Sequence, residues 1–223
     1  MPMCAAIREE GQGLPAAIPL FPLVGALLLP RGELPLNIFE PRYLAMLRDV
    51  MGSGRIIGMV QPRGEAGNAP PLHEIGCAGR VTAFAETDDG RFLITLRGVS
   101  RFRLVEELSS TTAYLQAKVD YADFAADLAP PSVSCGVARG ALMDVLGRYL
   151  ARQGLGVEKD ALDEAPDEIL VNSLATICPF SPVEKQALLE AADVGERAAR
   201  MIALMEFACA APSGPARGPT RPN

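Results

Sequence analysis

The pattern of the chain changes near residue 123, and this change constrains the fold more than any other feature. Before it, Gly and Pro recur at short intervals and separate apolar runs of strand length, which is typical of a β-barrel or sandwich. After it, a Pro-Pro linker at 130–131 is followed by helical periodicity almost to the C-terminus. The sequence therefore predicts an α+β protein in which a β-rich part precedes a helical part.

Strand signals fill the first part of the chain. The clearest lies around Asp89-Gly90, a pair that predicts a two-residue hairpin turn between two apolar runs, the second of which alternates with polar residues. The predicted strands are 17–21, 26–29, 55–60, 78–87, 91–97, 101–106 and 113–121.

One helix and one long loop are expected among these strands. Pro41 can occupy a first helical position, and apolar residues then recur on one side up to Gly52, so this helix is expected to plug one end of a barrel. Residues 62–72 are rich in Gly and Pro without any period, which predicts a mobile surface loop.

Helices dominate the second part. Apolar stripes predict two amphipathic helices at 135–153 and 166–178. The spacing of polar residues predicts the N-termini of two more helices, at Ser181 with Glu184 and at Asp193 with Glu196. The whole chain is thus expected to comprise a flexible N-terminus at 1–14, a β-barrel at 15–125, a helical bundle at 126–210 and a disordered tail at 211–223.

Composition argues against several classes of protein. A net charge of -6 disfavours a dedicated nucleic-acid binder, which needs clustered cations to neutralise phosphates. The five cysteines are scattered and have no metal-ligand spacing, as expected of buried thiols in a reducing compartment. The most apolar stretch, 14–30, is broken by three prolines and is too short to span a membrane, and residues 1–13 lack the pattern of a signal peptide. A cytoplasmic location is therefore expected.

A search for catalytic motifs finds none. No Gly-Lys pair occurs, so a Walker-type phosphate loop is excluded. His73 is the single histidine and lies beside the long loop, where a solvated side chain is expected, and no Gly-x-Ser-x-Gly elbow is present. A Ser-Lys dyad would need one of three lysines that are all expected to be solvated. The sequence predicts no metal, no cofactor and no enzymatic activity.

Two sets of side chains are candidates for binding, each with a plainer structural interpretation. Four arginines on consecutive predicted strands form either an anion site or, as we favour, a solvated barrel face balanced by nearby glutamates; they are Arg91, Arg97, Arg101 and Arg103. An aromatic and methionine-rich set forms either an adaptable apolar groove or, as we favour, part of the core; it comprises Phe39, Tyr43, Met46 and Met59.

Several strings occur together in a way that is similar to one known family. The chain resembles the N-terminal substrate-binding domain of the ATP-dependent protease Lon, strongly over residues 18 to about 121 and less diagnostically in the helical part. The strings that carry the resemblance are IPLFPLVGALLLPRGELPLNIFEPRYLAML, IGMVQPR, IGCAGRVTAF and DGRFLITLRGVSRFRL, with NSLATICPFSPVEKQALLEA in the helical part.

The resemblance implies a PUA-like β pseudo-barrel with one inserted helix, followed by a helical bundle, and a non-catalytic role in binding peptides or unfolded protein segments. The ATPase and protease modules that follow this domain in full-length Lon are not expected here, because the chain ends at Asn223. The residues of the matching strings become peptide-binding candidates, namely Phe39, Pro41, Arg42, Tyr43, Met46, Met59, Gln61, Pro62 and Arg63.

Three alternatives remain open at this stage. PUA-like folds include RNA readers, so the arginine set suggests an RNA-binding module, against which the acidic net charge weighs. A second alternative is an adaptor or regulator of a separate ATP-dependent protease. The third, an unconventional hydrolase, ranks well below the adaptor. The oligomeric state is not predicted.

Overall fold

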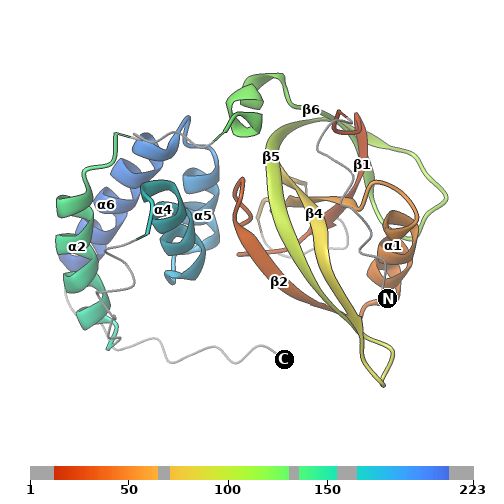
Figure 1. The fold of residues 1–223 in the computed structure, drawn as a ribbon, viewed down its shortest axis with the longest axis horizontal. Coiled ribbons are helices and arrows are strands. Elements are labelled where there is room, and N and C mark those ends of the chain that lie inside the picture. The colour runs from red at the N-terminus through yellow and green to blue at the C-terminus, as the bar shows by residue number, and fades with distance from the viewer. Residues whose placement is uncertain (1–12, 65–70, 131–135, 155–164, 211–223) are drawn as a thin grey trace, which may run out of the picture.

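The computed structural model describes residues 13–64, 71–130, 136–154 and 165–210. It has a β-rich half, residues 13–121, and a helical half, residues 136–210, which lie side by side (Figure 1). The predictions of a flexible N-terminus, a mobile centre of the long loop and a disordered tail fall on 1–12, 65–70 and 211–223, outside the described residues. Pro131 of the predicted linker also lies outside them, whereas Pro130 is described.

Five strands of the β-rich half close into a ring. They are β1 (Ala17–Pro22), β3 (Ile56–Val60), β4 (Ile75–Glu86), β5 (Phe92–Leu108) and β6 (Gln116–Asp120), and they pair in the order β5-β4-β3-β1-β6, with β6 returning to β5. Only the β1–β3 pair is parallel among them. Because β5 has 17 residues, its C-terminal part closes the ring while its N-terminal part extends beyond it.

Phe102 fills the interior of the ring, where it is fully buried among the aliphatic side chains of β1, β3 and β6. Two glycines make room for its ring. A Cβ added at Gly76 would lie 2.4 Å from Phe102 Cζ, and one added at Gly58 would lie 3.2 Å from Phe102 Cε1. The close packing of an aromatic side chain against glycine backbone therefore shapes this part of the core.

Helix α1 (Pro41–Met51) packs on the β-rich half, as expected from Pro41 at its first turn. It buries Tyr43, Met46, Leu47 and Val50, and the Tyr43 ring lies 4.2 Å from that of Phe21. The strand β2 (Glu33–Ile38) precedes α1 and pairs antiparallel with β5. Its register runs from Glu33 opposite Arg97 to Ile38 opposite Phe92. Together β2, β5 and β4 form a three-stranded extension below the ring (Figure 1).

The helical half contains α2 (Arg139–Arg152), α4 (Asp167–Ile177), α5 (Pro182–Leu189) and α6 (Val194–Ala210), with α6 packed against the other three. The 3-10 helix η1 (Ala122–Leu128) connects β6 to this half. Both predicted caps are confirmed. Ser181 and Glu184 form a reciprocal capping box, and Asp193 Oδ1 accepts a bond from Glu196 N at 2.8 Å.

One apolar core joins the two halves. It extends from Leu27–Leu29, Ile57 and Cys77 on the β side to α2, α4, α5 and α6 on the helical side. A shared core of this kind makes separate motion of the halves costly, because any opening exposes apolar surface to water. No helix in the described part of the chain is long and apolar enough to cross a membrane.

Three strand predictions need correction. Residues 26–29 are a buried irregular segment rather than a strand, and 91–97 and 101–106 belong to the single strand β5. The hairpin turn is also longer than two residues: Thr87 N donates to Arg91 O, and Gly90 takes a left-handed φ of 77°. The strand β2 is absent from the predicted set, because Pro35 interrupts its apolar alternation.

Candidate functional site

Buried polar side chains concentrate at the junction of the two halves. Among the described residues eight polar or charged side chains are buried, and all but Ser100 lie there: Gln61, Arg101, Asp127, Glu168, Asn172, Gln186 and Arg197. No buried side-chain nitrogen or oxygen in this part of the chain lacks a hydrogen bond. These groups therefore hold the two halves together through satisfied hydrogen bonds.

Arg101 is the centre of this junction. Its Nε and Nη2 donate to the two carboxylate oxygens of Asp127 at 2.8 and 2.9 Å, and its backbone N donates to Asp127 Oδ2 at 2.9 Å. The same guanidinium reaches the carbonyls of Leu189, Ala191 and Ala192 at the end of α5. One side chain of β5 thus fixes η1 and α5 at once.

Gln61 forms a second link. Its Nε2 donates to Pro182 O at 3.1 Å and to Gln186 Oε1 at 3.2 Å, while its Oε1 accepts from Gly25 N at 3.0 Å. Gln186 in turn donates to Ile75 O at 3.1 Å. The start of α5 is therefore tied to three segments of the β-rich half by neutral amides.

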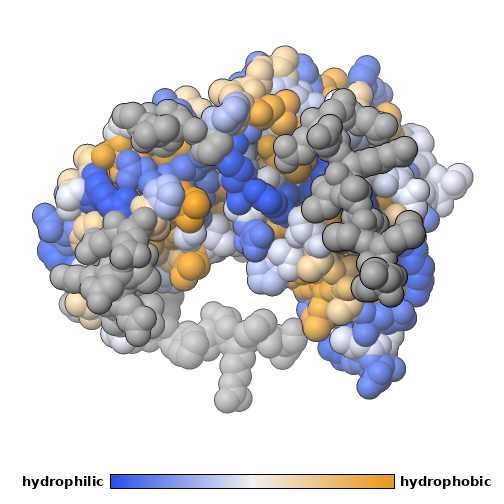
Figure 2. Space-filling model, viewed as in Figure 1, coloured by the Kyte–Doolittle hydropathy of each residue, from blue (hydrophilic) through white to orange (hydrophobic). Residues whose placement is uncertain are grey.

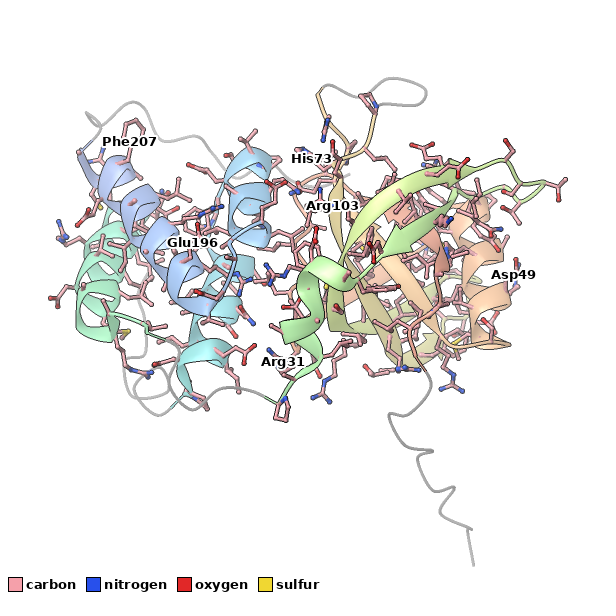
Figure 3. The ribbon with its side chains drawn as sticks, turned by 90° about the horizontal axis from the view of Figure 1, so that it is seen from above. Arg31, Asp49, His73, Arg103, Glu196 and Phe207 are labelled. Atoms are coloured by element: carbon pink, nitrogen blue, oxygen red, sulfur yellow. The ribbon has the colours of Figure 1, made fainter. Side chains whose placement is uncertain are left out.

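Arg31 anchors the segment that leads into β2. It takes a left-handed φ of 63°, a region that side chains with a Cβ rarely use. Its guanidinium pairs with Glu168 of α4, with Nε 2.8 Å from Oε1, and donates to Asp127 O at 2.7 Å. Figure 3 shows Arg31 at the junction, so helix α4 sets the position at which β2 begins.

The outer edge of β2 has no strand partner among the described residues. Gly98 N donates to Gly32 O, so the ladder bonds to β5 fall on the even-numbered residues of β2. The backbone groups of Glu33, Pro35 and Asn37 consequently point away from β5. This edge offers the N–H groups of Glu33 and Asn37 and the carbonyls of all three residues, and Pro35 is tolerated because no donor is needed there.

A shallow groove of about 510 Å³ lies on the β2–β5–β4 extension, lined by Pro35, Leu36, Asn37, Ala83, Phe84, Ala85, Leu93, Ile94 and Thr95. Register places Leu93 between Asn37 and Ala85, and Thr95 between Pro35 and Ala83, on its outward face. Leu93 is 48% exposed. We call these six outward residues the β2–β5–β4 face, and it is apolar apart from Asn37 and the Thr95 hydroxyl.

A cleft of about 990 Å³ opens where the N-terminal end of β2 meets α4. Its walls include Glu33 and Arg97 on the sheet side and Ile169, which is 57% exposed, on the helix side. Figure 2 shows a hollow between the helical half and the β4–β5 hairpin, with hydrophobic surface on both of its sides. The unpaired edge of β2 borders this hollow (Figure 1).

The structure does not bring the predicted peptide-binding residues together. Tyr43, Met46 and Met59 are in the core, as the favoured interpretation of that set expects, and Gln61 is in the junction. The alternative, an apolar groove that these three form with Phe39, is wrong. The others are more accessible and lie in two places: Phe39, Pro41 and Arg42 at the end of β2 and start of α1, and Pro62 and Arg63 beside His73.

The favoured interpretation of the four arginines, a solvated face balanced by acidic side chains, holds in part: Arg91, Arg97 and Arg103 are exposed, but Arg101 is not, and the four belong to one strand region rather than to consecutive strands. Arg101 is buried, Arg103 pairs with Asp123 and Glu74, and Arg91 pairs with Asp89 and lies 6.0 Å from the Phe39 ring. The acidic partners are not the glutamates expected from the sequence. Arg97 alone of the four has no ion pair with another described residue, and it lines the cleft.

The environments of His73 and Cys77 favour the uncharged forms of both side chains. The pKa of His73 is lowered by partial burial and then by Arg63, which favours its neutral form. Complete burial raises the pKa of the Cys77 thiol far above its usual range, so it stays protonated. Within the described residues no cluster of three His, Cys, Asp or Glu side chains is arranged to hold a metal.

Sequence reasoning missed the free edge of β2 and the face beside it. The available signal was the alternation of Leu34, Leu36 and Ile38 around Pro35, a pattern that fits an edge strand. Ile169 gave no signal, because its exposure depends on how α4 meets the sheet.

Comparison with known proteins assigns the fold. The family described as the ATP-dependent protease La (LON) substrate-binding domain matches residues 17–206. The Lon N-terminal domain protein from Xanthomonas campestris has a TM-score of 0.61 at 25% identity and covers 84% of this chain and 97% of its own. The N-terminal domain of Lon protease from the Mycobacterium avium complex has a TM-score of 0.58 at 16% identity, with 85% and 98% covered.

Curated relatives are much longer than this chain. Lon protease 2 of Sorangium cellulosum is 25% identical over 197 residues, which are 85% of this chain and 24% of the relative. Lon protease 2 of Myxococcus xanthus is 29% identical over 112 residues, or 49% and 13%. The chain therefore spans a quarter or less of these two proteins. From the extent of the family match and the shared α+β fold, we conclude that the chain belongs to the Lon substrate-binding domain family.

Proposed function

We propose that this protein binds extended polypeptide segments by adding them as a strand to the free edge of β2, and that it performs no chemistry on them. The observation that carries the proposal is an unpaired strand edge that borders both an apolar face and an open cleft. The family description and the name substrate-binding domain support the same class of ligand.

Strand addition suits a receptor for varied sequences. Main-chain hydrogen bonds supply affinity that every peptide offers, and neighbouring side-chain sites add preference. The outward groups of Glu33 and Asn37 provide the bonds, and a long side chain of the segment opposite Asn37 can extend across it toward Leu93, the register partner of Asn37 on β5. Residues of an unfolded segment meet these requirements because they are extended and expose apolar side chains.

Two finer features belong to the same proposal. The closed ring of strands is PUA-like in our interpretation, and the four helices act as a bundle that supports it. Three of the four candidate arginines, Arg91, Arg101 and Arg103, already pair with carboxylates. This argues against an RNA-binding role, which needs cations free to contact phosphates. A role as an adaptor for a separate protease has no specific structural feature in its favour.

The experiment compares Asn37→Pro with Asn37→Ala. Proline removes an outward N–H and places its ring at the free edge, whereas alanine keeps the N–H and shortens the side chain. Neither change removes a ladder bond to β5, and a residue preceding proline already fits a strand. Thermal unfolding should confirm that both variants keep the fold.

Binding is measured by fluorescence anisotropy with a labelled, reduced and alkylated unfolded protein. We expect Asn37→Pro to weaken binding about tenfold, the equivalent of one to two hydrogen bonds, and Asn37→Ala to bind like the parent protein. Equal binding by all three proteins would refute strand addition at β2. Strong binding of a short RNA that competes with the unfolded protein would favour the RNA-binding alternative instead.

A further inference from the structure

We propose that two copies of this chain form a symmetric dimer by pairing the outer edges of their β4 strands, which joins the two β2–β5–β4 extensions into one sheet. The surface consists of residues 83–86 and the charged side chains at the two ends of this stretch. The dimer does not depend on the proposed function, because β2 lies on the opposite side of each extension.

The outer edge of β4 is unpaired along residues 83–86. The ladder between β3 and β4 ends at Arg80, and Val81 N donates to Arg55 O at 2.9 Å. The register between β4 and β5 then shifts between Val81 and Ala83. Beyond this shift no described strand lies next to β4 on the β3 side, and all four residues of the stretch are exposed.

The backbone groups of Phe84 and Glu86 point out from this edge. Thr87 N donates to Arg91 O, so the ladder bonds between this stretch and β5 fall on the odd-numbered residues of β4. The even-numbered residues lie between these bonds, and their N–H and carbonyl groups are directed the opposite way. The edge therefore offers two donors and two acceptors to another strand.

This edge is complementary to itself. An antiparallel pair with its two-fold axis at Ala85 places Phe84 of each copy opposite Glu86 of the other, and each of these pairs exchanges both of its N–H···O bonds. The two Ala85 residues then form a non-hydrogen-bonded pair, in which opposite Cα atoms lie only about 4.5 Å apart. Small side chains fit this close approach.

The charges at the two ends of the edge match under the same symmetry. Arg55 and Arg80 at one end are exposed, and neither has an ion pair with another described residue. Arg80 Nη1 donates to Gly54 O at 2.9 Å, so its guanidinium lies on the β3 side of β4, where the second copy would bind. Asp88, in the turn at the other end, is exposed and likewise has no ion pair within the described residues.

Because the paired strands run in opposite directions, Asp88 of each copy reaches the end of the edge where Arg55 and Arg80 of the other copy lie. Each copy carries a net charge of -6, so the two chains repel one another at long range. The local cations offset this repulsion where the acidic turn approaches. Charge thus favours this register over a pairing that brings the two acidic turns together.

The centre of the β4 edge lacks the features that normally prevent strand pairing. Exposed edges usually carry charged residues or proline, as β2 does with Pro35, whereas Ala83, Phe84 and Ala85 are uncharged. Phe84 is 44% exposed, and one side of its ring packs 4.9 Å from the ring of Phe92. Figure 1 shows the β4–β5 hairpin projecting beyond the ring of strands and α1, so a second hairpin can approach it.

The joint sheet would have the order β2-β5-β4-β4-β5-β2, with a β2 strand at each outer margin. Both β2 edges remain free in this arrangement. One long unfolded chain could then contact two edges at once, which raises its overall affinity without any new kind of contact. This consequence alone rests on the proposed function.

The first test compares Glu86→Pro with Glu86→Ala. Proline removes the outward N–H without removing a ladder bond to β5, and Ala85 before it already has the extended conformation that proline requires. Alanine keeps the N–H and removes only the carboxylate. Asn37→Pro is a further control, because it changes the β2 edge instead. Circular dichroism checks the fold, and sedimentation velocity from micromolar to sub-millimolar concentration measures the dissociation constant of the dimer.

The second test reverses the charges. Asp88→Arg and the combined variant Arg55→Asp, Arg80→Glu each place like charges against one another in a dimer of identical copies, so both should dimerise more weakly than the parent protein. An equal mixture of the two restores opposite charges at both ends of the edge. The left-handed φ of 59° at Arg55 is compatible with aspartate.

We expect the parent protein, Glu86→Ala and Asn37→Pro to dimerise with similar dissociation constants. Glu86→Pro should raise the dissociation constant about tenfold, because each copy loses one main-chain bond. A parent protein that stays monomeric at every concentration overturns the inference. So does a folded Glu86→Pro protein that dimerises like the parent, or a dimer weakened by Asn37→Pro instead.

The charge-reversed mixture decides the question if Glu86→Pro does not fold. Recovery of the parent dissociation constant on mixing supports the dimer, and a mixture no tighter than its two components overturns it. Polypeptide binding by Asn37→Pro and Asn37→Ala is measured separately, so failure of the dimer leaves the proposed function standing.

Discussion

The junction between the halves and the free edge of β2 treat polar groups in opposite ways. At the junction, Arg101, Gln61 and their partners are buried, and each has its hydrogen bonds within the described part of the molecule. At β2, the backbone groups of Glu33, Pro35 and Asn37 are directed toward open space. The buried polar side chains thus join the two halves, whereas backbone N–H and carbonyl groups stay available at the outer edge of β2.

This difference assigns separate roles to the two regions. A saturated junction with a shared apolar core holds the walls of the cleft in place, because opening it would expose both apolar surface and unpaired charge. The β2 edge can then bind without a change in shape. If the two regions have these separate roles, substitutions at the junction should lower the unfolding free energy, and substitutions at the β2 edge should lower the affinity for polypeptides.

The largest effect is expected for Asp127→Ala. This change leaves the Arg101 guanidinium buried without its counter-charge, which typically costs about 3–5 kcal/mol of unfolding free energy. Urea unfolding followed by circular dichroism measures the change, and the shared core predicts one cooperative transition for the parent protein. Asp123→Ala is the matched control, because its ion pair with Arg103 is exposed and should contribute little to stability. Similar losses in both variants would contradict the central role of Arg101.

An intermediate effect is expected for Gln61→Ala. It leaves Gly25 N and Pro182 O, and part of Gln186, without their partner, at a cost of about 1–3 kcal/mol. Gln153→Ala, at the exposed end of α2, should change stability by less than about 0.5 kcal/mol. Thermal unfolding of the two variants is sufficient to compare them. A Gln61→Ala protein as stable as its control would show that water replaces the lost amide.

The smallest effect on stability, with a clear effect on binding, is expected for Leu93→Gln. Its side chain is about half exposed, so unfolding free energy should fall by no more than about 0.5 kcal/mol. Loss of its apolar contact should weaken binding of the labelled unfolded protein several-fold. Val105→Gln is the matched control on the same strand, with 53% exposure at the far end of β5. Equal weakening in both would place the contact elsewhere.

Local signals predicted most of the helical half. Ser181 with Glu184 and Asp193 with Glu196 form the expected caps, because a cap depends on residues three apart in the sequence. The same is true of α1, whose start depends on Pro41. Such features need no knowledge of the rest of the molecule.

The candidate site was largely beyond sequence reasoning because its elements depend on distant partners. Pro35 argues against a central strand, and only the presence of β5 beside it makes β2 an edge strand. Arg97 and Arg101 both alternate with apolar residues in the sequence. Arg101 alone is buried, because it pairs with Asp127, which lies 26 residues away in the sequence. Of the predicted binding residues, Phe39 directly follows β2 and Arg97 lines the cleft, and nothing in their local sequence separates them from the others.

Pro35 also limits what the exposed strand can do. Because Pro35 has no N–H, a second copy of the chain that paired with this edge would lack one hydrogen bond at the centre of β2. This disfavours the stacking of identical strands edge to edge. In the proposed complex, the same gap leaves one carbonyl of the bound segment without a partner from β2. Pro35 therefore lowers the tendency of this exposed edge to pair with identical strands.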